Sequence, residues 1–521
     1  MWRRGPADIH AERSAGAAST AGGQADRRRW YALVVVALAQ LMVVVDLSIV
    51  NVALPDAQKA LHISDDARSW AVTAYALAFG SLMLLGGRIA DYWGRKRAFI
   101  VGMIGFAAAS AVAGFSQNGA ELFASRVLQG AFGALLAPAS LSLLQVAFPA
   151  GKDRAKAFSV FGAVAGSGAA LGGVAGGILT QYASWRWCFL VNVPVAIIAV
   201  AAAICLVTES TGHGDTPYDL PGAITATLGL AGLVYGFTAA SLHGWSSLTT
   251  TTSISVAVLL LAGFVAVEAR STHPLLPLRI VLHRTRGGSF LTALLAGASI
   301  LGSLFFINYY LQTTRGYTPL ESGLGSLPIT VMFVLGTRFA ASLTYRFGPK
   351  KMMVAGAAIA TAGALALTTI GLRTSYAAHV LPGELLLGCG LCALFIPLPN
   401  AALIDVDDHD AGAASGLLNA TQQVGGAVGI ALFTTIYSSA VAAYLASHGR
   451  SGPYERLAAL HAYVQTFRWS AGAMLLSTLI AMLVIRARLE DFEPERAIMP
   501  SRSLPGAGGG PGRQAPSSDV V

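Results

Sequence analysis

Charged side chains are scarce in this chain of 521 residues. Lys, Arg, Asp and Glu together make up 12% of it, whereas hydrophobic residues make up 54%. A soluble domain carries about 25% charged residues. The low charge content therefore excludes an ordinary soluble protein, and the mean hydropathy of +0.60 predicts an all-α membrane protein with many crossings.

Cysteine is also rare. The chain has 4 cysteines, and all of them lie in apolar surroundings: Cys188, Cys205, Cys389 and Cys392. This pattern predicts no disulfide framework. Cys389 and Cys392 have the spacing of a redox or metal pair, but they lie among glycine and leucine in a hydrophobic run. Helix packing by small residues one turn apart is therefore the favoured interpretation.

The sequence lacks the patterns of an enzyme active site. It shows no nucleophile–base arrangement, no metal-ligand cluster, and no phosphate loop between a strand and a helix. Its net charge of +9 could suggest nucleic-acid binding, but the basic residues are scattered among short loops between hydrophobic runs. We expect no enzyme, no nucleic-acid partner, no metal and no cofactor, and an ion gradient rather than ATP as the energy source.

Hydrophobic runs of about 20 residues recur along the chain, and each can form one transmembrane helix. They lie near residues 31–52, 70–90, 98–116, 121–147, 157–179, 188–207, 221–241, 251–268, 288–311, 322–345, 352–371, 378–403, 412–440 and 468–486. These runs predict about fourteen transmembrane helices. We expect two six-helix bundles and a linker hairpin of two helices. The predicted parts are a disordered cytoplasmic tail at 1–29, a first bundle at 30–208, the linker at 209–287, a second bundle at 288–489 and a second disordered tail at 490–521.

Lys and Arg gather in alternate loops. If the N-terminus is cytoplasmic, clusters such as Arg27-Arg28-Arg29, Arg95-Lys96-Arg97 and Lys350-Lys351 all lie on the cytoplasmic side. Cytoplasmic loops carry an excess of Lys and Arg. We therefore expect a multi-pass protein of the inner (plasma) membrane with both termini in the cytoplasm.

One acidic residue, Asp46, lies well inside the first hydrophobic run. A carboxylate in hydrocarbon costs roughly 2.5–3.5 kcal/mol on insertion scales, so such a residue is usually functional. Asp46 is expected to take up and release a proton, or to face an ion or substrate path. Ser48 and Asn51 could hydrogen-bond it. The alternative is a structural ion pair with a nearby Arg.

Arg126 is a lone cation inside the fourth run. It is costly there unless it is paired, and Asp46 is the type of partner that it needs. Alternatively, Arg126 is a structural residue bonded to backbone carbonyls.

The loop after the second run has the sequence Gly86-Gly87-Arg88-Ile89-Ala90-Asp91-Tyr92-Trp93-Gly94-Arg95-Lys96-Arg97. Gly94 permits a tight turn, and Asp91 can pair with the basic cluster. Such a loop could act as a latch that holds the two halves together on one side. The alternative is an ordinary positive-inside loop. A partial copy follows the tenth run, Tyr345–Lys351, and such internal repeats are typical of transporters built from two related halves.

This loop resembles the signature loop of the major facilitator superfamily, except that Tyr92 stands where the family usually has a basic residue. Further segments resemble the family and its fourteen-helix drug:proton antiporter branch: Asp46–Pro55, Leu122–Gly130, Trp185–Pro194, Tyr309–Gln312, Gly316–Pro319, Gly412–Asn419 and Gln422–Gly426. The resemblance implies a multidrug or antibiotic efflux transporter. It also implies a proton-coupling role for Arg126 and a gating role for Gly87, Asp91, Gly94, Arg95, Lys96 and Arg97.

The fifth run is rich in glycine at four-residue spacing, which lets another helix approach closely. Its candidate packing residues are Gly168, Gly172, Gly173, Gly176 and Gly177. They resemble the antiporter motif of the family's exporters, although Gly173 replaces the motif's proline. A glycine permits a helix bend without imposing it, and generic tight packing is the alternative.

Glu384, near one end of the twelfth run, could be a second proton site or a cation-drug site, or an interfacial acid at a helix start. Polar and aromatic residues on core helices could line a cavity for a bulky amphipathic ligand, and each could equally serve packing: Asn51, Tyr75, Asn308, Tyr309, Gln312, Asn419 and Gln422.

Together these features predict a proton-coupled secondary transporter that exports a hydrophobic or cationic drug-like molecule by alternating access. Its expected partners are the small-molecule substrate, protons and the lipid bilayer, and it is expected to be a monomer. Two alternatives stay open: a proton-coupled metabolite transporter, and a non-transporting membrane sensor or scaffold.

Overall fold

The computed structural model describes residues 6–65, 67–148, 152–210, 219–271, 274, 276–406, 410–449 and 452–487. Helices, joined by turns and irregular connections, account for these residues, without a strand among them. The second predicted tail, 490–521, lies outside them. Helix α1 begins at Pro6, inside the segment predicted as the first tail, and side chains are described from residue 29 onward.

The first half of the chain forms a helical bundle. Its helices are α1 (Pro6–Ala60), α2 (Trp70–Trp93), α3 (Arg95–Phe115), α4 (Gly119–Ala147), α5 (Lys152–Tyr182), α6 (Trp187–Leu190) and α7 (Asn192–Leu206). Within this N-terminal bundle, α1 packs along α5, and α4 packs against both α2 and α3. Small residues on these helices permit the close packing that apolar helices need in lipid.

A hairpin of two helices follows, α8 (Leu220–His243) and α9 (Leu248–Arg270). Asp219 caps α8 by accepting a hydrogen bond from the Gly222 backbone, and Ser247 caps α9 in the same way through Thr250. The hairpin packs through α8 against α2 and α18, so it lies beside the boundary between the two halves.

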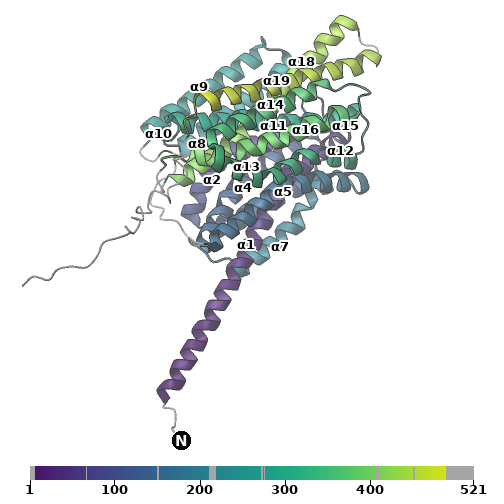
Figure 1. Cartoon of the computed structure of the whole chain (residues 1–521). Helices are drawn as coiled ribbons and strands as arrows, with labels where there is room; N and C mark the ends of the chain where they lie inside the picture. Colours follow the sequence, from purple (N-terminus) through teal and green to yellow (C-terminus); the bar gives the residue numbers. More distant parts are fainter. Residues whose placement is uncertain are drawn as a thin grey trace, which may run out of the picture.

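The second half forms the C-terminal bundle. Its elements are α10 (Leu278–Leu282), α11 (Arg284–Tyr309), the π-helical turn η1 (Tyr310–Thr314), α12 (Pro319–Gly325), α13 (Leu327–Phe347), α14 (Pro349–Ala366), the 3-10 turn η2 (Leu367–Thr369), α15 (Tyr376–His379), α16 (Leu381–Phe395), α17 (Leu398–Ala402), α18 (Ala411–His448) and α19 (Gly452–Leu483). The two bundles lie side by side and meet chiefly where α2 packs on α18 and α5 packs on α12 (Figure 1).

Among the described residues, 12 helices are long and apolar enough to cross a membrane, and the bent helix α2 would make 13. Helix α5, with 31 residues, occupies the position of the fifth predicted crossing. The helical membrane fold is confirmed, and the number fourteen stays a prediction. The last crossing begins at Tyr454 rather than near 468. The first turns of this helix bury Ala458 and Ala462 completely, but polar residues lie near them in the sequence. These turns therefore form no continuous hydrophobic run, and the sequence does not mark them as part of a crossing.

The two halves repeat one turn. Gly94 joins α2 to α3 with φ of 109°, and Gly348 joins α13 to α14 with φ of 88°. Glycine adopts these angles without steric cost. Both turns lie at the same end of the bundles, called the Gly94 end below. The opposite end, which carries the α1–α2 turn and helices α12 and α15, is called the Arg68 end.

Candidate functional site

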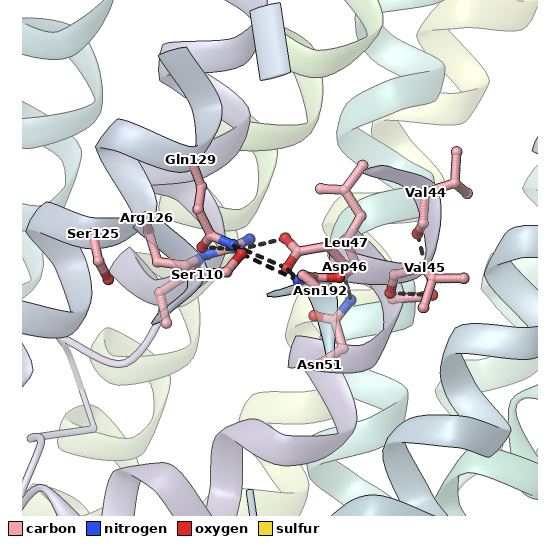
Figure 2. A network of polar contacts seen from close by, with 12 residues as sticks. Val44, Val45, Asp46, Leu47, Asn51, Ser110, Ser125, Arg126, Gln129 and Asn192 are labelled. Carbon is pink, nitrogen blue, oxygen red and sulfur yellow. Dashed lines mark hydrogen bonds and ion pairs between the residues drawn. The ribbon is translucent and has the colours of Figure 1, made fainter. Parts of the chain in front are cut away.

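Asp46 and Arg126 lie against each other inside the N-terminal bundle. Arg126 Nη1 is 2.5 Å from Asp46 Oδ2, and neither side chain is exposed. Asp46 Oδ1 accepts hydrogen bonds from Gln129 Nε2 at 3.1 Å and from Asn192 Nδ2 at 2.9 Å. Both amides also donate to Ser110 Oγ, at 2.6 and 3.2 Å (Figure 2). Helices α1, α4 and α7 therefore meet at one carboxylate, and α3 joins the network through Ser110.

Arg126 has support that is independent of Asp46. Its Nε donates to the Ala71 carbonyl oxygen at 2.8 Å, and its Nη1 also donates to Gln129 Oε1 at 2.8 Å. The guanidinium carbon lies 4.4 Å from the centre of the Tyr75 ring. Nη2 has no hydrogen-bond partner among the described residues. The cation thus keeps a carbonyl, an amide and a ring face when the charge on Asp46 is removed.

This arrangement can switch between two charge states. Removing one partner of a buried ion pair typically costs about 3–5 kcal/mol, because the remaining charge is left without compensation. A proton on Asp46 removes its charge but keeps its oxygens available for hydrogen bonds. The network can therefore hold either an ion pair or a neutral acid beside a separately supported cation.

Sequence reasoning singled out Asp46 and Arg126 but not Ser110, Gln129 and Asn192. Gln129 follows Arg126 by three residues and therefore shares its helix face. Asn192 is a lone amide between two valines in a hydrophobic segment. These two features could have identified Gln129 and Asn192 as candidate site residues. Ser110 offers no such feature, because a serine in a hydrophobic helix commonly bonds to its own helix.

Glu384 lies apart from this network, in α16 of the C-terminal bundle. It is fully buried. Its Oε2 accepts a hydrogen bond from the Tyr376 hydroxyl at 2.9 Å, and its Oε1 has no partner among the described residues. The Tyr376 hydroxyl also lies 2.7 Å from the Gly325 carbonyl oxygen. The structure thus provides a second enclosed acid, with a different partner set from that of Asp46.

The glycines of α5 form two rows that face different neighbours. In the first row, a Cβ added at Gly168 would lie 2.8 Å from Val44, and one at Gly176 would lie 2.9 Å from Ile49, both on α1. Gly172 belongs to this row, and a Cβ there would meet Ser48. These positions recur every fourth residue, so a single face of α5 packs onto α1.

The second row faces the other bundle. A Cβ at Gly177 would lie 2.6 Å from Leu320, and one at Gly323 of α12 would lie 2.2 Å from the Gly173 carbonyl oxygen. A Cβ at Gly173 itself would lie 3.4 Å from the Gly323 oxygen, an ordinary contact. The residue at the motif's proline position therefore lies on the boundary between the halves, where α5 and α12 touch backbone to backbone.

The Gly94 loop contacts its own bundle. Asp91 accepts hydrogen bonds at 3.0 Å from Arg95, four residues later in the loop. Glu209, just after α7, accepts from the Lys96 backbone at 3.0 Å and lies 3.7 Å from Arg97. The predicted pairing of Asp91 with the basic cluster is present in the structure, whereas the latch role of the loop stays a prediction. Glu209 adds a second acidic group beside this basic cluster.

Gly87 lies beside Pro138 of α4, again within the N-terminal bundle. Arg88 reaches farther, to the Pro274 carbonyl oxygen at 3.5 Å in the segment that follows α9. Arg88 thus links the loop to the segment between α9 and α10.

The predicted cavity residues separate into several environments. Tyr75 is fully buried beneath Arg126 and belongs to the charged network. Asn308 accepts from Ser322 within the C-terminal bundle at 3.0 Å. Asn419 is exposed and donates to the carbonyl oxygen of Ser415 in its own helix. Three of the others are partly buried: Asn51, which donates to the Leu47 carbonyl oxygen; Gln422, whose backbone lies against Gly297; and Gln312, described next.

The two bundles make direct contact at the Arg68 end. Gln312 Nε2 donates to the Val52 carbonyl oxygen at 3.0 Å, and the Leu320 backbone donates to Gln181 Oε1 at 3.3 Å. The Tyr309 hydroxyl lies 3.3 Å from Gln58 Oε1. These contacts join α1 and α5 to η1, α11 and α12, so this end of the boundary is closed in the structure.

Comparisons with known proteins agree with this architecture. The bacterial Spinster homologue solved in an inward-facing and unoccupied conformation superposes with a TM-score of 0.63 at 16% identity, covering 89% of this chain and 98% of that one. The POT family transporter PepTSo superposes with a TM-score of 0.65 at 15% identity, covering 88% and 97%. At such identity these structures establish the fold alone.

Sequence relatives are more similar. The puromycin resistance protein pur8 of Streptomyces alboniger is 41% identical over 482 residues, 92% of this chain and 96% of the relative. The tetracenomycin C resistance and export protein of Streptomyces glaucescens is 33% identical and covers 83% and 80%. Residues 36–430 match the sequence profile of the Major Facilitator Superfamily. This chain of two helical bundles therefore belongs to the Major Facilitator Superfamily.

Proposed function

We propose that this protein exports a drug-like antibiotic across the plasma membrane in exchange for protons. The observation that carries the proposal is the fully buried pair of Asp46 and Arg126, whose acid can lose its charge while the cation keeps other partners. The names of the relatives, which concern resistance to puromycin and tetracenomycin C, supply the substrate class. No cofactor takes part in this scheme.

The exchange proceeds through two conformations. With Asp46 ionised, its bonds to Arg126, Gln129 and Asn192 hold helices α1, α4 and α7 together. A proton that arrives from outside neutralises Asp46 and weakens this connection, because the charge-assisted bonds become ordinary ones. Substrate leaves toward the outside, and proton release to the cytoplasm resets the carrier. In this scheme the monomer is the working unit, and the Gly94 end faces the cytoplasm.

Asp46→Asn tests the role of the acid. The substitution keeps the shape and the hydrogen-bonding capacity of the side chain but cannot exchange a proton. In proteoliposomes with an imposed pH gradient, we expect puromycin accumulation driven by the gradient to fall to the level of protein-free liposomes. Binding of puromycin to the purified variant should persist.

Asp56→Asn is the matched control, because Asp56 lies on the same helix outside the network. It should retain accumulation driven by the gradient. Full accumulation by Asp46→Asn would refute the proposed coupling role, and failure of the unmodified protein to move puromycin or any antibiotic of a test panel would refute export itself.

A further inference from the structure

A buried arginine crosses the boundary between the bundles at the Arg68 end. Arg68 precedes α2 in the N-terminal half, and its side chain is 1% exposed. Its guanidinium carbon lies 3.4 Å from the centre of the Tyr309 ring, 5.3 Å from that of Tyr437 and 5.9 Å from that of Phe305. All three rings belong to the C-terminal half. We call Phe305, Tyr309 and Tyr437 the aromatic cage.

Few polar groups compensate the charge of Arg68. Its Nη1 lies 3.3 Å from Asp65, whose side chain is 71% exposed and therefore screened by solvent. Nε and Nη2 have no hydrogen-bond partner among the described residues. The faces of the aromatic rings thus provide most of the close surroundings of this cation, and such interactions are strongest when the cation is removed from water.

The cage and its occupant belong to different bundles. Asp65 and Arg68 move with the α1–α2 turn, whereas Tyr309 and Phe305 are on α11 and Tyr437 is on α18. Any motion that opens the Arg68 end must therefore withdraw both charged residues from the rings. The cage that remains has three aromatic faces and the buried ring of Tyr463, whose centre is 5.0 Å from that of Tyr437.

We propose that the aromatic cage is a binding site for the cationic group of an organic molecule, and that Arg68 fills this site whenever the Arg68 end is closed. Cages of aromatic rings bind quaternary ammonium groups through the negative faces of the rings. A cationic cargo and Arg68 would then compete for one surface, so that occupancy by the cargo opposes reclosure until it has left. The inference rests on the proposed export function for its biological role, but binding to the cage does not depend on transport.

The test uses the purified full-length protein in detergent and phenyltrimethylammonium as the probe, measured by calorimetry. Arg68→Ala removes the internal competitor and should bind the probe at least about tenfold more tightly than the unmodified protein does. The double variant Arg68→Ala/Tyr309→Leu should lose this gain. The uncharged isostere tert-butylbenzene should not distinguish Arg68→Ala from the unmodified protein.

Arg346→Ala is the matched control, since Arg346 also lies over a ring, that of Phe347, but is exposed at the Gly94 end. It should leave probe affinity unchanged. Arg68→Lys is the second variant: it keeps a cation but not the flat guanidinium, and should bind the probe more tightly than the unmodified protein does, a comparison that does not require Arg68→Ala to fold. Equal affinity of the unmodified protein and the Arg68 variants, or a gain that survives Tyr309→Leu, overturns the proposal. Neither result would affect the outcome of the puromycin experiments.

Discussion

Asn192 is the residue through which α7 reaches the carboxylate of Asp46. Its amide joins Asp46 Oδ1 and Ser110 Oγ, so it links α1, α3 and α7 at a point from which water is excluded. A buried acceptor that loses a hydrogen-bond donor retains its desolvation cost without compensation. The stabilising effect of Asn192 therefore depends on the charge that it faces.

Replacing Asn192 by Val tests this dependence. The variant should unfold more easily by about 1–3 kcal/mol, because one donor to an ionised acid is removed. Thermal unfolding in detergent at neutral pH measures the change. Asn419→Val serves as the control: Asn419 is exposed, and among the described residues its side chain bonds to Ser415 of its own helix, so its loss should have little effect. Equal destabilisation by the two substitutions would show that Asp46 does not depend on Asn192.

Helix α5 shows how spacing along one element selects its partners. Gly168, Gly172 and Gly176 face α1, whereas Gly173 and Gly177 face α12 of the other bundle. The first row holds one bundle together and the second forms part of a boundary that must open during alternating access. A single glycine-rich helix therefore serves both permanent and reversible contacts.

Gly323→Ala should weaken the reversible contact. A methyl group there would lie 2.2 Å from the Gly173 carbonyl oxygen, so α5 and α12 must separate. We expect faster maleimide labelling of a cysteine placed at Leu320, which is partly buried against Gly177, and reduced export of puromycin. Gly173→Ala, whose added carbon makes an ordinary contact at 3.4 Å, and Gly162→Ala, which meets nothing within 4 Å, should both behave like the unmodified protein. Unchanged labelling in Gly323→Ala would mean that this contact does not keep the Arg68 end closed.

Sequence patterns identify residues whose burial costs much free energy and whose cost can be recognised from their neighbours in the sequence. Asp46 and Arg126 were recognisable because an isolated charge in an apolar helix is expensive, and the hydrophobic runs located nearly every helix. Ser110 was not recognisable, because its role depends on which helices meet. The contact of Glu209 with the Gly94 loop was not recognisable for the same reason, because it requires α7 to end beside the loop. The aromatic cage likewise joins residues that are far apart in the sequence.

At the scale of the whole molecule, the distribution of basic residues predicts which end faces the cytoplasm. The Gly94 end carries Arg95, Lys96 and Arg97 in the first half and Arg346, Lys350 and Lys351 in the second. Both halves therefore place a basic turn at the same end, although they are separated by a linker hairpin. Membrane insertion retains such clusters on the cytoplasmic side, so we expect the closed Arg68 end to lie outside.

Labelling of single cysteines tests this orientation. In a background with the four native cysteines replaced, Arg346→Cys at the Gly94 end should react with a membrane-impermeant maleimide in inside-out vesicles but not in intact cells. His448→Cys, at the end of α18 on the opposite side, should show the reverse pattern. Both positions are exposed, so burial does not explain a difference between them. Labelling of Arg346→Cys in intact cells would place the basic turns outside, and a proton arriving at the Arg68 end would then come from the cytoplasm, contrary to the direction of exchange proposed here.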